Sequence, residues 1–454
     1  MSTSRRLPPP QLPPLPFLLP SFAGSRLANG LALRAARWGR RPTVAVSVLF
    51  PGAGSAADPP GREGTAEITG ETFLGGTRRR DARALAEAID DLAANLEVSA
   101  GSDSSVARLS ILERDLDAGL ALLAEVLTES VFPEDEFEKN RRRQIDFIAE
   151  QRSEPDFLAR ERLLDRLYPG HPYGRLTATE KGLESLTRDS VALFAASRFS
   201  LAGATLILAG AADPDDLLRA GARAFEGLPA GSGAPAAAVP PPPRIDGFSI
   251  HLVHRPGSVQ TNLLFARPAL QRRSPRFPAA LVANQALGGG ASSRLFHILR
   301  EERSLTYGAY SSLAARVAGG QFGASIDCRT EVTREACSGL FDLVRDFASE
   351  GPTEEEHARA RKYLLGSFPI PRETPGGVAQ DEITRLLHGL PGDEWATWRD
   401  RLGAVSRPDA CHVAADFFDP ATGILAAVGD AKLIRPVLES FGDTTLWDAD
   451  GPRA

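Results

Sequence analysis

The sequence is poor in cysteine and has no long apolar run. Three cysteines occur among 454 residues, and no pair has the Cys-x-x-Cys spacing. A disulfide framework and a zinc ribbon are therefore excluded, and three single thiols are typical of a reducing compartment. A membrane-spanning helix needs about 18 apolar residues in a row. No such run is present, so we expect no membrane span.

The sequence also lacks the signals of nucleic-acid and nucleotide binding. Its formal net charge is −6 and its pI about 5.8, which argues against nucleic acid as a main partner. The most glycine-rich segment, LGGGASSRLF, contains neither Gly-Lys-Ser/Thr nor Gly-x-Gly-x-x-Gly. Without either phosphate-binding pattern, a nucleotide-binding parallel sheet is not expected.

Proline dominates the N-terminal segment. Seven of the first twenty residues are prolines, and they interrupt the apolar helix that a signal peptide needs. We therefore predict that residues 1–21 form a disordered or surface-draped arm. Because no signal is expected, we predict a cytoplasmic location.

Residues 228–245 are rich in proline, alanine and glycine, and such a stretch is typical of a linker. The halves on either side resemble each other. Leu183–Phe199 matches Leu402–Phe418, and Pro133 precedes an acidic segment as Pro352 does, each second member lying 219 residues after the first. A repeat of this length is too long for a solenoid. We therefore predict two similar domains, residues 22–227 and 246–446.

Each half mixes strand and helix patterns. Thr43–Phe50 alternates and is rich in β-branched residues, which predicts a strand. Residues 82–96 then carry one apolar helical stripe, formed by Leu85, Ile89, Leu92 and Leu96. Residues 95–112 return to strand-like alternation. This order predicts an α+β fold in which each domain packs helices on an antiparallel sheet.

Several segments resemble the pitrilysin/insulinase metallopeptidase family. In the second half these are LVHRPGSVQTNLLF, GGGASSRLFHILREERSLTYGAYSS (Gly288–Ser312), GSFPIPRETPGG and ILAAVGDAKLI. In the first half, YPGHPYGR (Tyr168–Arg175) is similar to the family's first-domain signature. The matches keep their order over roughly residues 22–445. The resemblance implies two homologous domains that form half of a clam-shell chamber.

The zinc motif of that family is missing. Active members carry His-x-x-Glu-His on a helix of the first domain, where the histidines hold Zn²⁺ and the glutamate activates water. A further glutamate completes the metal shell. When the motif is aligned on Gly76–Thr77, the two histidine positions fall on Glu67 and Glu71, and the general-base position falls on Gly70. The distal ligand falls on Phe147 or Ile148, so all of these positions are degenerate.

These residues do not suit zinc. A catalytic zinc site usually has three protein ligands, mostly imidazoles, and an open fourth position. Glycine cannot take a proton, and two carboxylates would make an oxygen-only site that zinc does not favour. We therefore predict no metal in this chain and expect Glu67 and Glu71 to be solvated or salt-bridged helix residues.

The second half keeps a different part of the family's site. In the family, the second domain supplies an Arg–Tyr pair seven residues apart, and Arg300 and Tyr307 have this spacing. The resemblance implies that both residues donate hydrogen bonds where negative charge develops on the substrate carbonyl. From the residues alone, the alternative is that Arg300 pairs with a carboxylate and Tyr307 packs in the core.

The loop before this pair contains three consecutive glycines, which permit close backbone approach. The resemblance implies that the loop contacts a bound peptide, with substrate-binding positions at Gly288, Gly289, Gly290, Ser292 and Ser293. The alternative is a plain tight turn.

The family also occurs in divided forms, in which one subunit carries zinc and a homologous subunit keeps the Arg–Tyr pair. The resemblance implies that this chain is the zinc-free subunit of a heterodimeric metallopeptidase, inactive alone, with zinc on the partner. Its substrate would be an unfolded peptide added as a strand to a sheet edge. Alternatives are a non-catalytic scaffold and a homodimer that binds peptides without cleaving them. Neither nucleic acid nor a membrane is expected as a partner.

Overall fold

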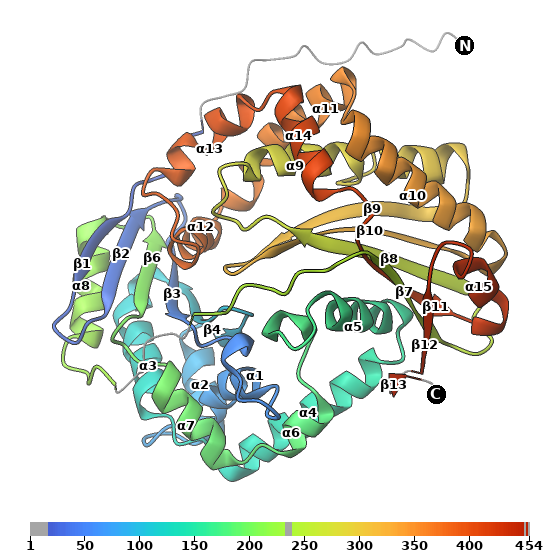
Figure 1. Cartoon of the computed structure of the whole chain (residues 1–454). Helices are drawn as coiled ribbons and strands as arrows, with labels where there is room; N and C mark the ends of the chain where they lie inside the picture. Colours follow the sequence, from blue (N-terminus) through green and yellow to red (C-terminus); the bar gives the residue numbers. More distant parts are fainter. Residues whose placement is uncertain (1–16, 232–237, 449–450, 453–454) are drawn as a thin grey trace, which may run out of the picture.

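A computed structural model describes residues 17–231, 238–448 and 451–452, and it contains two sheets, each packed with helices (Figure 1). Residues 1–16 of the predicted arm and residues 232–237 of the predicted linker lie outside the described residues. Among the helices of the described ranges, none is both long enough and apolar enough to cross a bilayer.

The first sheet has six strands in the order β1-β2-β6-β3-β5-β4. The strands are β1 Ala23–Arg26, β2 Ala32–Arg37, β3 Thr43–Pro51, β4 Asn95–Ala100, β5 Ser104–Leu112 and β6 Thr205–Gly210. The α-helices of this half are α1 Thr65–Thr72, α2 Ala82–Asp91, α3 Leu116–Glu129, α4 Glu134–Gln151, α5 Pro155–Leu167, α6 Glu180–Glu184, α7 Arg188–Arg198 and α8 Pro214–Phe225.

The second sheet has the order β13-β12-β7-β11-β8-β10-β9. The strands are β7 Phe248–His254, β8 Gln260–Ala269, β9 Thr306–Ala315, β10 Gly320–Arg329, β11 Gly423–Gly429, β12 Thr444–Asp448 and the two-residue β13 Gly451–Pro452. The helices are α9 Phe277–Leu287, the π-helix η5 Phe296–Glu302, α10 Thr333–Glu350, α11 Glu354–Ser367, α12 Pro375–Leu387, α13 Glu394–Gly403, α14 Arg407–Phe417 and α15 Ala431–Leu438.

The two sheets repeat one topology, which confirms two homologous α+β domains. The order β2-β6-β3-β5-β4 in the first sheet corresponds to β7-β11-β8-β10-β9 in the second. We expected purely antiparallel sheets, but both sheets are mixed. β2 runs parallel to β6, and β7 runs parallel to β11 and β12. A parallel pair needs a crossover connection, and the long helical segments between these strands provide it.

One helix of each domain packs against the sheet of the other domain. α12, which lies between β10 and β11 of the second sheet in sequence, packs against β3 and β6 of the first sheet. In turn, α5 packs against β8 and β11 of the second sheet (Figure 1). The apolar layer under α12 joins Ala379 and Ile383 to Leu49, Val106 and Ile207. The layer under α5 has the same character, with Leu158, Leu163, Leu264, Ala426 and Val428 among its members.

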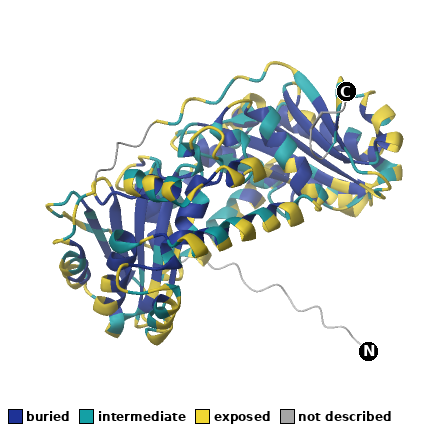
Figure 2. Cartoon of the chain, turned by 90° about the horizontal axis from the view of Figure 1, so that it is seen from below, coloured by how far each residue is buried: buried dark blue, intermediate teal, exposed yellow. Residues whose placement is uncertain are grey.

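The opposite face of each sheet packs against helices of its own domain, and these two layers form the main cores. Figure 2 shows the buried residues running along the strands of both sheets. Burial of about 25 cal/mol per Å² of apolar surface is the main favourable term for such layers. Because a helix of the other domain packs on one face of each sheet, neither sheet has a complete core without that domain.

The described end of the N-terminal arm adds to this junction. Phe17 makes edge-on ring contacts with Trp38 of the first domain and Phe368 of the second, at 5.8 and 6.0 Å between centroids. The Trp38 indole N–H donates to the Arg372 carbonyl at 2.8 Å, and the Arg372 guanidinium pairs with Asp381. The arm therefore lies where the two domains meet.

The predicted helix 82–96 is too long at its C-terminal end. α2 ends at Asp91, and Ala93 takes a left-handed conformation with φ 46°. Leu96, expected on the helical stripe, lies instead in β4, where it is 6% exposed. Short helix and strand patterns overlap at this boundary, because an apolar residue four positions after Leu92 fits both.

We expect Ile383→Ala to destabilise both domains together. Ile383 lies in α12 but is buried at 3% exposure against the first sheet, and such a truncation costs about 2–4 kcal/mol. Urea unfolding followed by circular dichroism should show one shifted transition. Leu433→Ala, at a side chain that is 60% exposed, should change the free energy of unfolding by about 0.5 kcal/mol or less. Two separate transitions would contradict the mutual packing.

Candidate functional site

Helix α1 carries Glu67, Gly70 and Glu71, which the resemblance aligns with two zinc ligands and the general base. Asp58 caps its start, because the carboxylate accepts hydrogen bonds from the N–H groups of Gly64 and Ala66, both at 2.8 Å. Glu67 and Glu71 are one turn apart on the resulting helix, and residues at this spacing lie on one face. The helix therefore directs both carboxylates toward α4.

Side chains of α4 satisfy both carboxylates. The Gln144 amide donates to Glu67 Oε1 at 2.8 Å, and the Arg143 guanidinium pairs with Glu71 at 3.1 Å. The residue that meets Glu67 is thus Gln144, one turn before the expected Phe147, which is 43% exposed. Sequence reasoning missed Gln144, and its only signal was its position one turn from Phe147.

Burial raises the pKa of Glu67 to about 7, and the neighbouring charges of Glu71 and Asp58 act in the same direction, while the Gln144 hydrogen bond opposes them. This set does not fit zinc, because it offers no imidazole and one carboxylate is already paired with Arg143. In the described part of the chain, no group of three or more His, Cys, Asp and Glu side chains is arranged to hold a metal ion.

Main chain occupies the space beside Gly70, the expected base position. A Cβ atom at residue 70 would lie 2.8 Å from the Val98 carbonyl oxygen of β4. Glycine therefore lets α1 approach the edge strand, and a glutamate could enter only if the helix moved. A cavity of about 320 Å³ remains beside it, lined by residues that include Glu71, Glu97, Val98, Lys139 and Arg143.

The Arg–Tyr pair lies at the edge of the second sheet. Arg300 is in η5, and its guanidinium lies 4.6 Å from the centroid of the Phe296 ring. That ring in turn contacts Tyr310 of β9, with 5.7 Å between centroids. Among the described residues, no carboxylate lies within ion-pair distance of Arg300, which is exposed. Stacking on Phe296 thus positions the cation without neutralising it.

A β-bulge turns Tyr307 outward. Ile326 pairs with Ala309, but Cys328 pairs with Thr306, so β9 has one residue more than β10 at this point. The Thr306 hydroxyl closes the bulge by accepting from the Gly308 N–H at 3.0 Å. Tyr307 is consequently 91% exposed. Bulges commonly redirect side chains beside functional sites.

The glycine-rich loop has two parts. Gly288 is buried, its carbonyl accepts from the Ser311 N–H at 2.9 Å, and a Cβ atom there would lie 2.2 Å from that nitrogen. Ser293 is also buried, at 2% exposure. These two residues fix the loop to the domain, whereas Gly289, Gly290 and Ser292 reach the surface.

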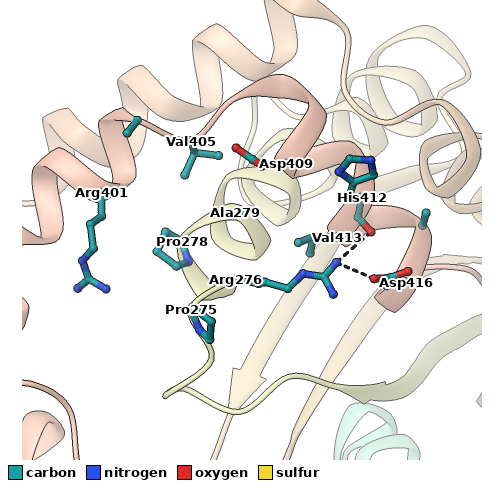
Figure 3. A pocket seen from close by; sticks show the side chains of 12 residues that line it. Pro275, Arg276, Pro278, Ala279, Arg401, Val405, Asp409, His412, Val413 and Asp416 are labelled. Carbon is teal, nitrogen blue, oxygen red and sulfur yellow. Dashed lines mark hydrogen bonds and ion pairs between the residues drawn. The ribbon is translucent and has the colours of Figure 1, made fainter.

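The two candidate sites are separate within the chain. In the described residues, no hydrogen bond or ion pair joins the α1–α4 cluster to η5 or β9. A cavity of about 700 Å³ lies elsewhere, between the start of α9 and α13–α14 (Figure 3). There the Arg276 guanidinium pairs with Asp416 at 2.6 Å and donates to the His412 carbonyl. None of the predicted site residues lines this cavity.

Comparisons with known proteins agree with these observations. Residues 38–181 match the family model described as insulinase (peptidase family M16), and residues 185–364 match the model described as peptidase M16 inactive domain. An uncharacterized zinc protease of Streptomyces coelicolor is 26% identical over 77% of this chain and 81% of its own length. The non-peptidase homolog YmxG of Helicobacter pylori is 24% identical over 77% and 80%.

Solved structures share the fold. A peptidase M16 inactive domain from Pseudomonas fluorescens superposes with a TM-score of 0.84 and 24% identity, over 90% of this chain and 98% of that one. A protease from Helicobacter pylori gives a TM-score of 0.82 with 18% identity, over 90% and 100%.

We expect Glu67→Gln to stabilise the protein at pH 8 and to have little effect near pH 4.5. The folded-state pKa of Glu67 lies above its ordinary value, so this group favours folding when protonated, and that contribution is lost as the pH rises toward 7. Glutamine keeps the acceptor oxygen without the buried charge. Urea unfolding should show a gain of about 1–2 kcal/mol at pH 8. Glu87→Gln, at an exposed helix position, should show no such pH dependence.

Gly70→Ala should destabilise the fold by about 1–2 kcal/mol, because the new Cβ atom would press on the Val98 carbonyl. Gly366→Ala is the matched control, since Gly366 is also helical and nothing lies within 4 Å of its Cβ position. There alanine should be neutral or stabilise by up to about 1 kcal/mol. Thermal or urea unfolding measures both, and equal effects would show that α1 is not held against β4.

Proposed function

Because the chain belongs to the insulinase family of M16 peptidases, we propose that it is the zinc-free subunit of a heterodimeric metallopeptidase. A homologous partner carries the metal and the general base. This chain contributes Arg300 and Tyr307, which lie on its second domain and face the peptide across a shared chamber. Alone, the chain does not cleave peptides.

The exposure of Tyr307 is the observation that carries this proposal. A tyrosine retained only for packing would be buried, whereas Tyr307 is 91% exposed and is directed outward by a bulge in an edge strand. Arg300 is likewise exposed and lacks an ion-pair partner among the described residues. Two strong donors left free at one sheet edge suit a ligand that arrives from outside.

The chemistry of amide hydrolysis gives these donors a purpose. Attack on the scissile carbonyl builds negative charge on its oxygen, and a phenol O–H and a guanidinium both stabilise such charge. Loss of one donor of this kind typically lowers the rate by about 10²–10³. The free edge of β9 can also pair with an extended peptide, because strand addition uses main-chain hydrogen bonds.

Two findings support the absence of independent metal chemistry. The α1–α4 cluster is internally satisfied by Gln144 and Arg143, and one relative bears the name non-peptidase homolog. That name also favours a second candidate function, a non-catalytic scaffold or a peptide-binding homodimer of the same fold. The two candidates differ in whether Arg300 and Tyr307 affect cleavage.

The test is cleavage of an internally quenched, unfolded peptide by this chain, by a homologue with an intact His-x-x-Glu-His motif, and by the mixture. We expect activity only in the mixture, and we expect Arg300→Ala or Tyr307→Phe to lower kcat at least tenfold. Tyr363→Phe and Arg345→Ala are the matched controls, since both side chains are exposed on α11 and α10 and should leave the rate unchanged.

Full activity of the mixture with both site variants would overturn the catalytic role and leave the scaffold. Activity of the isolated chain, with one bound zinc per molecule, would overturn the division of the site between two chains.

A further inference from the structure

One face of the first sheet is only half covered. α12 covers the part near β6 and β3, where Leu49, Val106 and Ile207 pack against Ile383. Toward β4 the same face is left uncovered, and its side chains become polar there. The polar side chains Asn95, Glu97 and Ser110 are exposed on this part of the sheet, so it is accessible to a ligand.

The uncovered part is the floor of a cavity of about 660 Å³. Strands β3, β4 and β5 form the floor, the loop between β2 and β3 forms one wall, and the start of α12 forms another. The polar and charged lining residues are Arg40, Arg41, Thr43, Ser47, Asn95, Glu97, Arg108, Ser110, Glu373, Thr374 and Gln380. A volume of this size is typical of ligand sites.

Arginines give the cavity its electrostatic character. Arg108 donates to Ser99 at 2.8 Å and to Gln380 at 3.2 Å, and it lies 3.6 Å from Glu97. Arg40 and Arg41 are exposed, and neither has a hydrogen-bond or ion-pair partner among the described residues. Because Glu97 is balanced by Arg108, the only remaining acid, Glu373, cannot neutralise both free guanidinium groups.

The loop that presents these two arginines is fixed at both ends. Before them, the Trp38 indole donates to the Arg372 carbonyl at 2.8 Å. Gly39 takes a left-handed conformation with φ 86°, and its Cβ position lies 3.6 Å from Pro375. After them, the Pro42 carbonyl accepts from the Glu113 N–H at 2.9 Å. The backbone that carries the two arginines is therefore fixed at the mouth of the cavity, which lowers the backbone entropy lost on binding.

We propose that this cavity binds an acidic segment of an extended peptide, with its carboxylates on Arg40 and Arg41. Guanidinium groups bind carboxylates through paired N–H donors. The cavity also opens beside β4, the edge strand of the first sheet, so a peptide lying along that edge can place its side chains over the cavity floor. The inference rests on the proposed function in taking a peptide as the ligand, but binding needs no partner subunit.

The experiment measures fluorescence anisotropy of the isolated full chain with a labelled peptide of about ten residues that contains several glutamates. The reference peptide has glutamine at each of those positions. We expect the acidic peptide to bind at least tenfold more tightly, and the preference to weaken as salt is added. The double variant Arg40→Gln/Arg41→Gln should bind the acidic peptide about tenfold more weakly and bind the reference peptide with unchanged affinity.

Arg37→Gln is the matched control, because Arg37 is an exposed arginine at the end of β2 that does not line the cavity. It removes a similar charge and should leave affinity unchanged. Ser110→Phe, an exposed floor position, should fill the cavity and weaken binding. Equal affinity for the two peptides, no binding at all, or equal effects of the Arg37 and Arg40/Arg41 variants would each overturn the proposal.

Failure here is distinguishable from failure of the proposed function. Cleavage by the mixed subunits depends on Arg300 and Tyr307 in the second domain, whereas this binding is measured without a partner and depends on the first domain. An oligonucleotide that displaced the acidic peptide with equal strength would assign the arginines to a different polyanion and would likewise overturn the proposal.

Discussion

The exchange of α5 and α12 is the constraint on which the rest of the structure depends. Each of these helices completes the apolar layer of the sheet that belongs to the other half of the chain. The relative position of the two sheets is therefore set by close-packed side chains, and packed interiors do not deform continuously. The edge strands β4 and β9, one in each sheet, keep their orientation for the same reason, and so do the residues that they carry.

The apolar layers under the exchanged helices, which stabilise the fold, are separate from the predicted metal positions. The degenerate metal positions lie on α1 and α4, away from the exchanged layers. At those positions a carboxylate can be paired with Arg143 or an amide, and a glycine can replace a general base, without changing either layer. The unfavourable effect is the local burial of a carboxylate, which raises the pKa of Glu67. Substitutions at these predicted positions can therefore leave the architecture unchanged.

Much of the fold was predictable from the sequence. The periodicity of apolar residues indicates individual helices and strands, and the internal repeat indicates two similar domains. The strand at Thr43–Phe50 and the duplicated α+β plan are confirmed. The parallel strand pairs were not predictable, since pairing partners more than a hundred residues apart leave no local signal. The early end of α2 was missed because Leu96 suits a helix and a strand equally.

The candidate site was likewise predictable only in part. The absence of zinc ligands follows from residue types alone, but the contacts that replace them depend on how α1 and α4 face each other. Gln144 was therefore missed, and so was the approach of α1 to Val98, which only a glycine permits. For Tyr307, the family resemblance singled out the residue, whereas its exposure depends on a register shift between β9 and β10.

The irregularity in β9 has a second consequence, for solubility. A straight edge strand of ten residues offers a row of unpaired main-chain groups on which another chain can grow a sheet, and aggregation begins in this way. The extra residue at the start of β9, together with an outward tyrosine, interrupts that row. This interruption disfavours edge-to-edge pairing of β9 with the same strand of other copies.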